Sequence, residues 1–268
     1  MKEGNKAIFL DHKINRITYK DMRFGECDDS PGSYVPGATT ILQAAPKSSH
    51  YYDWLKQYGK DADTIMMEAM EKGSAVHGAT EKYDRGEEVR VVDENDKPVY
   101  SSMEWEMIMR YVDFSDKHKP KIILNESTYG LLSLGYSGTM DRVLEINGEN
   151  WLLDIKTGNL YEYYFMQLAA YKKLFEEAQM FYWKEIRHKI DRVGILHLNA
   201  KTRGEDKTGK AMQGQGWVIE TPDMWTKSKD PVKYYYDLFQ NVKTMWEFQN
   251  PTFKPNNKIF SISIQKAK

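Results

Sequence analysis

The spacing of apolar positions predicts short strands and several helices in the first 120 residues. Alternating apolar and polar residues indicate a strand, whereas apolar residues three or four positions apart indicate a helix. A segment rich in Asp, Ser, Pro and Gly separates the two patterns and predicts a loop at 27–37. The predicted strands are 7–10 and 14–20, and the predicted helices are 38–45, 50–58, 63–83 and 99–117.

The rest of the chain opens with three predicted strands at 121–132, 136–146 and 150–157. Asn147-Gly148 joins the second strand to the third, and Asn-Gly is the strongest short-range hairpin signal. The elements predicted after the hairpin are a helix at 161–180, strands at 191–200 and 216–221 with a polar loop at 201–216, and a helix at 231–248. This order predicts an α/β fold with a mixed central sheet flanked by helices and a helical N-terminal elaboration.

Composition is that of an ordinary globular protein and limits the function only weakly. The 268 residues are 41% apolar and 29% charged, with a net charge of −1. This balance does not mark a nucleic-acid binder, although a local basic patch would suffice for one. No apolar run approaches the ~20 residues that cross a bilayer, the N-terminus lacks a secretory signal, and the single cysteine, Cys27, excludes an internal disulfide. We therefore expect a cytoplasmic protein without a membrane partner.

Two aspartates and a lysine on the predicted hairpin form a candidate metal site. Side chains alternate along a strand, so Asp154 and Lys156 share a face, and the hairpin returns the chain past Asp141. Gly138 nearby permits the close approach of backbone or ligand. Carboxylate oxygens suit hard cations such as Mg²⁺ or Mn²⁺. The alternative is an ion pair on a surface strand, because Asp-x-Lys by itself is a common pattern.

Four further polar residues have spacings that could join them to this group. Gln167 and Tyr171 lie one turn apart on the helix that follows the hairpin. His77 lies on the predicted helix at 63–83, and Glu126 lies on the strand before that of Asp141. Each has a structural alternative, because a helical histidine or a buried Gln–Tyr pair can serve packing alone, and Glu126 can be a charge at a strand edge.

This assembly resembles the PD-(D/E)XK nuclease superfamily, in particular its RecB-like exonuclease branch, which includes phage exonucleases and the mitochondrial genome maintenance exonuclease. The order and spacing of the motifs agree over roughly a hundred residues. Some relatives hold an iron–sulfur cluster with four cysteines, and this chain has only Cys27. The matching segments are G-S-A-V-H at 73–77, Glu126, G-T-M-D at 138–141, D-I-K-T-G at 154–158 and Q-L-A-A-Y at 167–171.

The resemblance implies one nuclease domain over 1–268, with a PD-(D/E)XK core, similar to restriction endonucleases, at 99–268. Residues 1–98 would form the N-terminal elaboration that carries the histidine. It further implies bound Mg²⁺ or Mn²⁺ as the cofactor. The implied metal ligands are His77, Asp141, Asp154 and the backbone carbonyl of Ile155.

The resemblance also implies how the remaining residues take part in phosphodiester hydrolysis by water. Lys156 would position or activate the attacking water. Glu126 would lie near the metals, either supporting a ligand or binding a second ion. Gln167 and Tyr171 would brace the lysine or contact the DNA backbone.

DNA is the substrate that the resemblance implies, degraded from single-stranded ends in phage or in replication, repair and recombination. Replication or recombination proteins are then candidate partners. The first candidates for phosphate contacts are Lys201, Arg203, Lys207 and Lys210 of the polar loop, although basic runs are usually solvated faces. The alternatives are a structure-specific or restriction-type endonuclease on the same core, a DNA-binding protein without turnover, and another Mg²⁺-dependent phosphoesterase.

Overall fold

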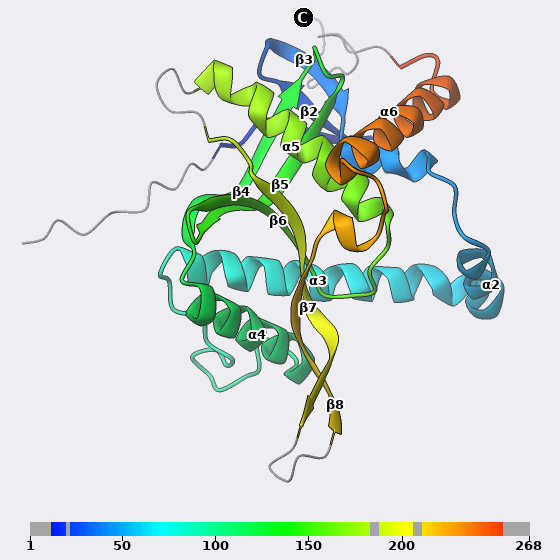
Figure 1. Ribbon diagram of the computed structural model, residues 1–268. Helices are drawn as coiled ribbons and strands as arrows, with labels where there is room; N and C mark the ends of the chain where they lie inside the picture. Colours follow the sequence, from blue (N-terminus) through cyan, green and yellow to red (C-terminus); the bar gives the residue numbers. More distant parts are fainter. Residues whose placement is uncertain (1–11, 20–21, 183–187, 206–210, 254–268) are drawn as a thin grey trace, which may run out of the picture.

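A five-stranded sheet between two helical layers forms the centre of the computed structural model (Figure 1), which describes residues 12–19, 22–182, 188–205 and 211–253. The strands lie in the order β4-β5-β6-β7-β8. Their bounds are β4 Lys121–Leu131, β5 Tyr136–Ile146, β6 Glu149–Lys156, β7 Arg192–Glu205 and β8 Ala211–Glu220.

The sheet is mixed, as predicted from the order of the elements. Strands β4, β5 and β6 form an antiparallel meander, and Asn147 and Gly148 turn the chain between β5 and β6 with φ of 52° and 82°. Both residues adopt the left-handed conformation that a tight hairpin of this kind requires. Helix α5, Tyr163–Tyr182, then returns the chain so that β7 pairs parallel to β6, and β8 pairs antiparallel to β7.

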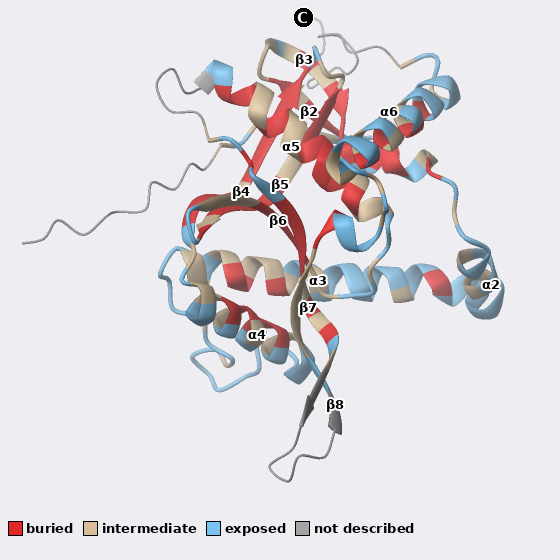
Figure 2. Ribbon diagram, in the orientation of Figure 1, coloured by how far each residue is buried: buried red, intermediate tan, exposed pale blue. Residues whose placement is uncertain are grey.

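Each face of the sheet is covered by a pair of helices. Helices α3, Ala62–Asp84, and α4, Ser102–His118, bury apolar side chains against one face, together with Leu153 and Ile155 of β6. Helices α5 and α6, Pro231–Gln249, pack against the other face, where Leu152 of β6 is buried. Figure 2 shows the sheet buried between the two layers. A strand that is covered on both faces needs apolar side chains on both faces. Consecutive apolar residues of β6, Leu152 and Leu153, meet this need because they point to opposite faces.

Serine side chains cap the N-termini of two helices. Ser48 caps α2, Ser49–Tyr58, by accepting a hydrogen bond from the backbone N–H of Tyr51. Ser101 and Glu104 form a reciprocal capping box that begins α4 at Ser102, three residues after the predicted start. Within the described residues, each predicted helix is found, and in the predicted order. The predicted helix at 38–45 forms α1, Ala38–Ile41, followed by a 3₁₀ turn, Leu42–Ala44. No helix among the described residues is long and apolar enough to cross a membrane.

A second, three-stranded sheet corrects the loop predicted at 27–37. It contains β1 Arg16–Tyr19, β2 Met22–Cys27 and β3 Ser30–Pro36, and β2 and β3 form an antiparallel hairpin. Local Ser, Pro and Gly content indicated a loop, but long-range contacts decide the conformation here. At Gly130 a Cβ would lie 2.4 Å from the carbonyl oxygen of Glu26, so only glycine lets this sheet cross β4 so closely. The predicted strand at 7–10 lies outside the described residues.

The loop predicted at 201–216 is also wrong over most of its length. Strand β7 continues to Glu205 and β8 begins at Ala211, so the two strands form an arm that projects from the sheet (Figure 1). Backbone pairing such as Lys201 with Gln215 holds the arm together. The sequence of 201–216 lacks the alternation of apolar and polar residues by which strands are recognised.

Candidate functional site: a histidine and four acidic or basic side chains

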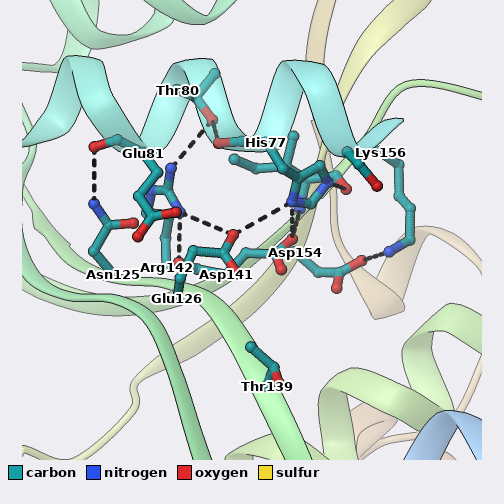
Figure 3. A network of polar contacts seen from close by, with 12 residues as sticks. His77, Thr80, Glu81, Asn125, Glu126, Thr139, Asp141, Arg142, Asp154 and Lys156 are labelled. Atoms are coloured by element: carbon teal, nitrogen blue, oxygen red, sulfur yellow. Dashed lines mark hydrogen bonds and ion pairs between the residues drawn. The ribbon is translucent and has the colours of Figure 1, made fainter. Parts of the chain in front are cut away.

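His77, Glu126 and Asp141 converge from three different elements and could hold a metal ion. One nitrogen or oxygen of each side chain lies within 4.8 Å of the others. His77 Nδ1 lies 3.4 Å from Glu126 Oε1 and 3.5 Å from Asp141 Oδ2. The helix α3 supplies the histidine, β4 the glutamate and β5 the aspartate. The structure thus brings together three of the residues expected at the site (Figure 3).

Backbone contacts fix the position of the histidine and of Asp141. His77 Nε2 donates to the carbonyl oxygen of Ile155 at 2.9 Å. Asp141 Oδ2 accepts from the backbone N–H of Ile155 at 2.7 Å. The peptide groups on both sides of Ile155 therefore face the site, one offering a carbonyl and the other an N–H. Glu126 has φ of 50°, a left-handed conformation that is unusual for a non-glycine residue and is commonly found at functional sites.

Asp154 and Lys156 form an ion pair beside this cluster. The Lys156 ammonium contacts Asp154 Oδ2, and Gln167 donates to Asp154 Oδ1 at 3.0 Å. As predicted, Asp154 and Lys156 share a face of β6, and Figure 3 shows Lys156 turned toward Asp154. The Lys156 nitrogen also lies 4.7 Å from the centre of the Tyr164 ring. Asp154 is thus held by the side chains of Lys156 and Gln167. The two carboxylates that face His77 are those of Asp141 and Glu126.

Gln167 and Tyr171 of α5 pack against the strands that carry the site: Gln167 contacts Asp154, and Tyr171 lies against Gly138. Both are buried, at 7% and 4% exposure, so neither presents a surface to DNA. The ring of Tyr171 fills the space above Gly138, where a Cβ would lie 2.3 Å from Tyr171 Cε1. The close approach expected at Gly138 is therefore made by a tyrosine ring. Of the two roles expected for Gln167 and Tyr171, this burial favours bracing over DNA contact.

A fully buried arginine, which sequence reasoning missed, links the acidic residues. The guanidinium of Arg142 donates to Asp84, to the backbone carbonyl of Asp141 at 2.7 Å and to Thr80 Oγ1 at 3.1 Å. It also lies 3.5 Å from Glu126 Oε1. Asp84 in turn accepts from the hydroxyl of Tyr111 at 2.7 Å. The available signal was a charged residue directly after Asp141 in a strand of the predicted central sheet, because a buried charge needs a partner.

The electrostatics around His77 favour a positive charge at this point. Burial alone lowers the pKa of His77, but the Asp141 carboxylate and then Glu126 outweigh it and raise this pKa to about 9. Burial alone raises the pKa of Glu126, but its hydrogen bond to His77 and the charge of Arg142 bring it below the usual range. A protonated His77 therefore neutralises the carboxylates, a task that a cation could also perform.

The Asp154–Lys156 pair has pKa values set by burial and by mutual attraction. Burial raises the pKa of Asp154, and the nearby Lys156 opposes this rise. Burial lowers the pKa of Lys156, but the carboxylates of Asp154 and Asp141 outweigh it, so the net shift is upward. Lys156 therefore remains a cation near neutral pH and can act on an anionic group.

The donor atoms suit Mg²⁺ or Mn²⁺. Neighbouring ligands of an octahedral ion with bonds of about 2.1 Å lie about 3 Å apart, and His77 Nδ1 lies 3.4 Å from Glu126 Oε1 and 3.5 Å from Asp141 Oδ2. Asp154 Oδ2 is buried and accepts no hydrogen bond of regular geometry within the described part of the chain, although Lys156 contacts it. Carboxylates with one imidazole favour Mn²⁺ as well as Mg²⁺, since imidazole is a common ligand of transition metals. The residues present therefore fit the expected ion.

The expected phosphate-binding residues are only partly placed. Lys201 is exposed on β7, where the arm passes helix α4, and Arg203 belongs to the same strand. Lys207 and Lys210 lie outside the described residues. Lys201 borders a shallow pocket of about 440 Å³ with Glu106 and Arg110 of α4 and Gly214 and Gln215 of β8. Lys201 is thus on the arm, and its contact with DNA stays a prediction.

Comparison of the sequence with models of protein families gives no match, and comparison with curated proteins gives none either. What the fold and the site define is an α/β protein with a mixed five-stranded sheet and a candidate metal centre. Any narrower class depends on the chemistry of the site.

Proposed function

We propose that this chain is a metal-dependent DNA nuclease with a PD-(D/E)XK core and that it degrades DNA from single-stranded ends. The observation that carries this proposal is the convergence of His77, Glu126 and Asp141, with the Asp154–Lys156 pair alongside. Three strands in an antiparallel meander, followed by a helical crossover to a parallel strand, are compatible with the proposed core.

The reaction is hydrolysis of a phosphodiester by water. The water oxygen attacks phosphorus, and the bond from phosphorus to the 3′ oxygen breaks, which leaves a 5′-phosphate and a 3′-hydroxyl. Bound Mg²⁺ or Mn²⁺, held by His77, Asp141, Glu126 and the Ile155 carbonyl, would lower the pKa of the water and neutralise charge on the phosphate. Asp154, the further ligand expected from the sequence, lies outside the three side chains whose donor atoms are within 4.8 Å of one another, and its Oδ2 atom contacts Lys156.

Lys156 contributes a positive charge and N–H donors at the reacting phosphate. Asp154 orients its ammonium, and Gln167 fixes the Asp154 carboxylate by donating to Oδ1. A preorganised cation of this kind stabilises negative charge that develops in the transition state. Loss of Lys156 should therefore slow hydrolysis more than it weakens DNA binding.

The test is a nuclease assay on end-labelled linear single-stranded DNA and on closed circular single-stranded DNA, with Mg²⁺, Mn²⁺ or EDTA. The variants are Lys156→Ala and a matched control, Lys173→Ala, whose partly exposed side chain pairs with Glu177 on α5. We expect the wild type and Lys173→Ala to degrade the linear strand only. EDTA and Lys156→Ala should each abolish this activity.

Other results would change the proposal in defined ways. Cutting of the circle would identify an endonuclease on the same core. DNA binding without cutting in either metal would indicate a binding protein without turnover. Cleavage of RNA or nucleotides in preference to DNA would indicate another phosphoesterase.

A further inference from the structure

Seven aromatic side chains form a surface that leads away from the Asp154–Lys156 pair. We call them the aromatic surface: Tyr51, Tyr52, Trp54 and Tyr58 of α2, and Tyr161, Tyr163 and Tyr164 at the start of α5. None belongs to the metal-binding cluster, and Tyr164 contacts Lys156 beside it. We propose that this surface binds the unpaired bases of a single-stranded nucleic acid by stacking.

The first group of rings adjoins the proposed site directly. The Tyr164 ring lies under the Lys156 ammonium at 4.7 Å, and Tyr163 lies 4.7 Å from Tyr164 between ring centres. Tyr161 stacks on Tyr163 at 5.5 Å with an angle of only 9° between the ring planes. Tyr161 is 48% exposed, so the outer face of this stack is open to solvent.

The second group of rings lies on α2, a helix with no buried residue. Tyr51 and Trp54 are stacked at 6.2 Å, and Trp54 and Tyr58 lie 5.6 Å apart. Figure 2 shows α2 exposed or half-buried along its whole length, at the end of α3 and away from the main body. Packing within the core therefore does not account for these rings, although aromatic side chains normally contribute most when they are buried.

Lys47 connects the two groups. Its ammonium lies 5.6 Å from the centre of the Tyr163 ring, and it precedes α2 by two residues. Because Lys47 lies next to Ser48, the cap of α2, this contact places the start of α2 near the start of α5. A continuous series of contacts therefore leads from Lys47, next to α2, through the rings of Tyr163 and Tyr164 to Lys156 at the proposed site.

The segment around α2 carries no net positive charge that would attract the phosphates of a nucleic acid. Residues 47–63 contain three lysines and three aspartates, so three minus three leaves no net charge. Binding here would have to come from the rings. Planar rings match nucleobases, and every base has a face on which an aromatic ring can stack. The bases are accessible only when they are unpaired, which selects single-stranded over double-stranded nucleic acid.

The test compares two fluorescein-labelled strands with the same number of phosphates, (dT)15 and a 15-residue abasic strand. Binding is measured by anisotropy in EDTA, so no hydrolysis occurs. We expect the wild type to bind (dT)15 about tenfold or more tightly than the abasic strand. Tyr52→Ala with Trp54→Ala should remove most of that preference, and Trp54→Phe should keep it. Phe248→Ala is the matched control, because Phe248 is 78% exposed at the far end of α6.

The inference is overturned if the wild type binds both strands equally, or if the double variant keeps the full preference for (dT)15. It is also overturned if the wild type shows no preference for bases and forms a dimer, whereas the double variant is a monomer. In that case α2 binds a second copy of the chain. This inference rests on the proposed function for the claim that the bound strand is cut. The stacking of bases on the aromatic surface is tested separately from hydrolysis. If the protein prefers (dT)15 but has no nuclease activity, the stacking inference stands and the proposed function fails. If it is an active nuclease without this preference, the proposed function stands and the stacking inference fails.

Discussion

His77 Nε2 donates to the carbonyl oxygen of Ile155 at 2.9 Å, and this contact joins helix α3 to strand β6 at the candidate metal site. The other ring nitrogen faces Glu126 and Asp141 at 3.4 and 3.5 Å. One imidazole thus contacts the three strands β4, β5 and β6, and its protonation state governs the charge of the whole cluster. A cation that enters the cluster must replace the proton on that ring.

Mn²⁺ binding should therefore become tighter as the pH rises. The pKa of His77 is raised from 6.5 to about 9 by Asp141 and Glu126, which outweigh the opposing effect of burial. Between these values the metal-free protein holds a proton that Mn²⁺ must displace, so affinity should increase by about tenfold per pH unit and level off above about 9. Calorimetry from pH 6.5 to 8.5, in buffers of different ionisation enthalpy, measures the proton released.

Two further results check the role of His77. His77→Asn should bind Mn²⁺ more weakly and release no proton. Because a raised pKa stabilises the fold below the unfolded value of 6.5, the stability of the EDTA-treated wild type should fall as the pH rises through about 9. A wild type that releases no proton on binding Mn²⁺ would show that His77 is not a ligand.

Removal of the Arg142 side chain should destabilise the fold strongly. Arg142→Met leaves the buried Asp84 carboxylate without its cationic partner, with the Tyr111 hydroxyl as its donor, and removes the side-chain donor to the Asp141 carbonyl, at a cost of about 3–5 kcal/mol in the free energy of unfolding. Arg142→Lys should not restore stability, because an ammonium cannot replace the several N–H groups of the guanidinium. Urea denaturation measures both variants.

Arg192 provides the control for this prediction. Its half-exposed guanidinium pairs with Glu149 at 3.2 Å, so Arg192→Met should cost less than about 1 kcal/mol. The combined change Arg142→Met with Asp84→Leu should be less destabilising than Arg142→Met alone, because it also removes the stranded charge. Equal losses for the single and combined variants would contradict an electrostatic origin.

Gly138→Ala should destabilise the protein, whereas Gly73→Ala should not. A Cβ at position 138 would lie 2.3 Å from the buried Tyr171 ring, and such overpacking costs about 1–3 kcal/mol. A Cβ at position 73 would meet only Thr157 Oγ1 at 3.6 Å, and alanine favours a helix by up to about 1 kcal/mol over glycine. Thermal unfolding compares the two variants. If Tyr171→Leu does not reduce the cost of Gly138→Ala, contact with the ring is not its cause.

Cys27 should react slowly with thiol reagents while the protein is folded. Burial, and then the negative charges of Asp29 and Asp28, raise the pKa of the Cys27 thiol to about 12. Almost no thiolate therefore exists at pH 8, and the thiolate is the reactive form. Ellman's reagent should label the native protein over hours and the urea-unfolded protein within minutes. Rapid labelling of the native protein would show that Cys27 is accessible.

The sequence by itself determined the elements whose signals are local. Asn147-Gly148 specifies a hairpin through the conformations these residues favour, and the hairpin brings Asp141 close to Asp154 and Lys156. Ser48 and Ser101 begin helices because their side chains accept backbone hydrogen bonds. The mixed sheet followed from the order of these elements. Each of these outcomes depends on residues that are close together in the chain.

Only the tertiary structure decided the outcomes that depend on distant partners. Arg142 and Asp84 are 58 residues apart, and nothing in either local segment identifies the other as its partner. Strand β3 and the β7–β8 arm are held by backbone pairing with partner strands, and such pairing needs no alternation of apolar and polar residues. The tertiary structure also placed Glu126 beside His77 and gathered the aromatic rings of α2 and α5 next to Lys156. Such arrangements arise when packing brings separate elements together, so a local pattern cannot specify them.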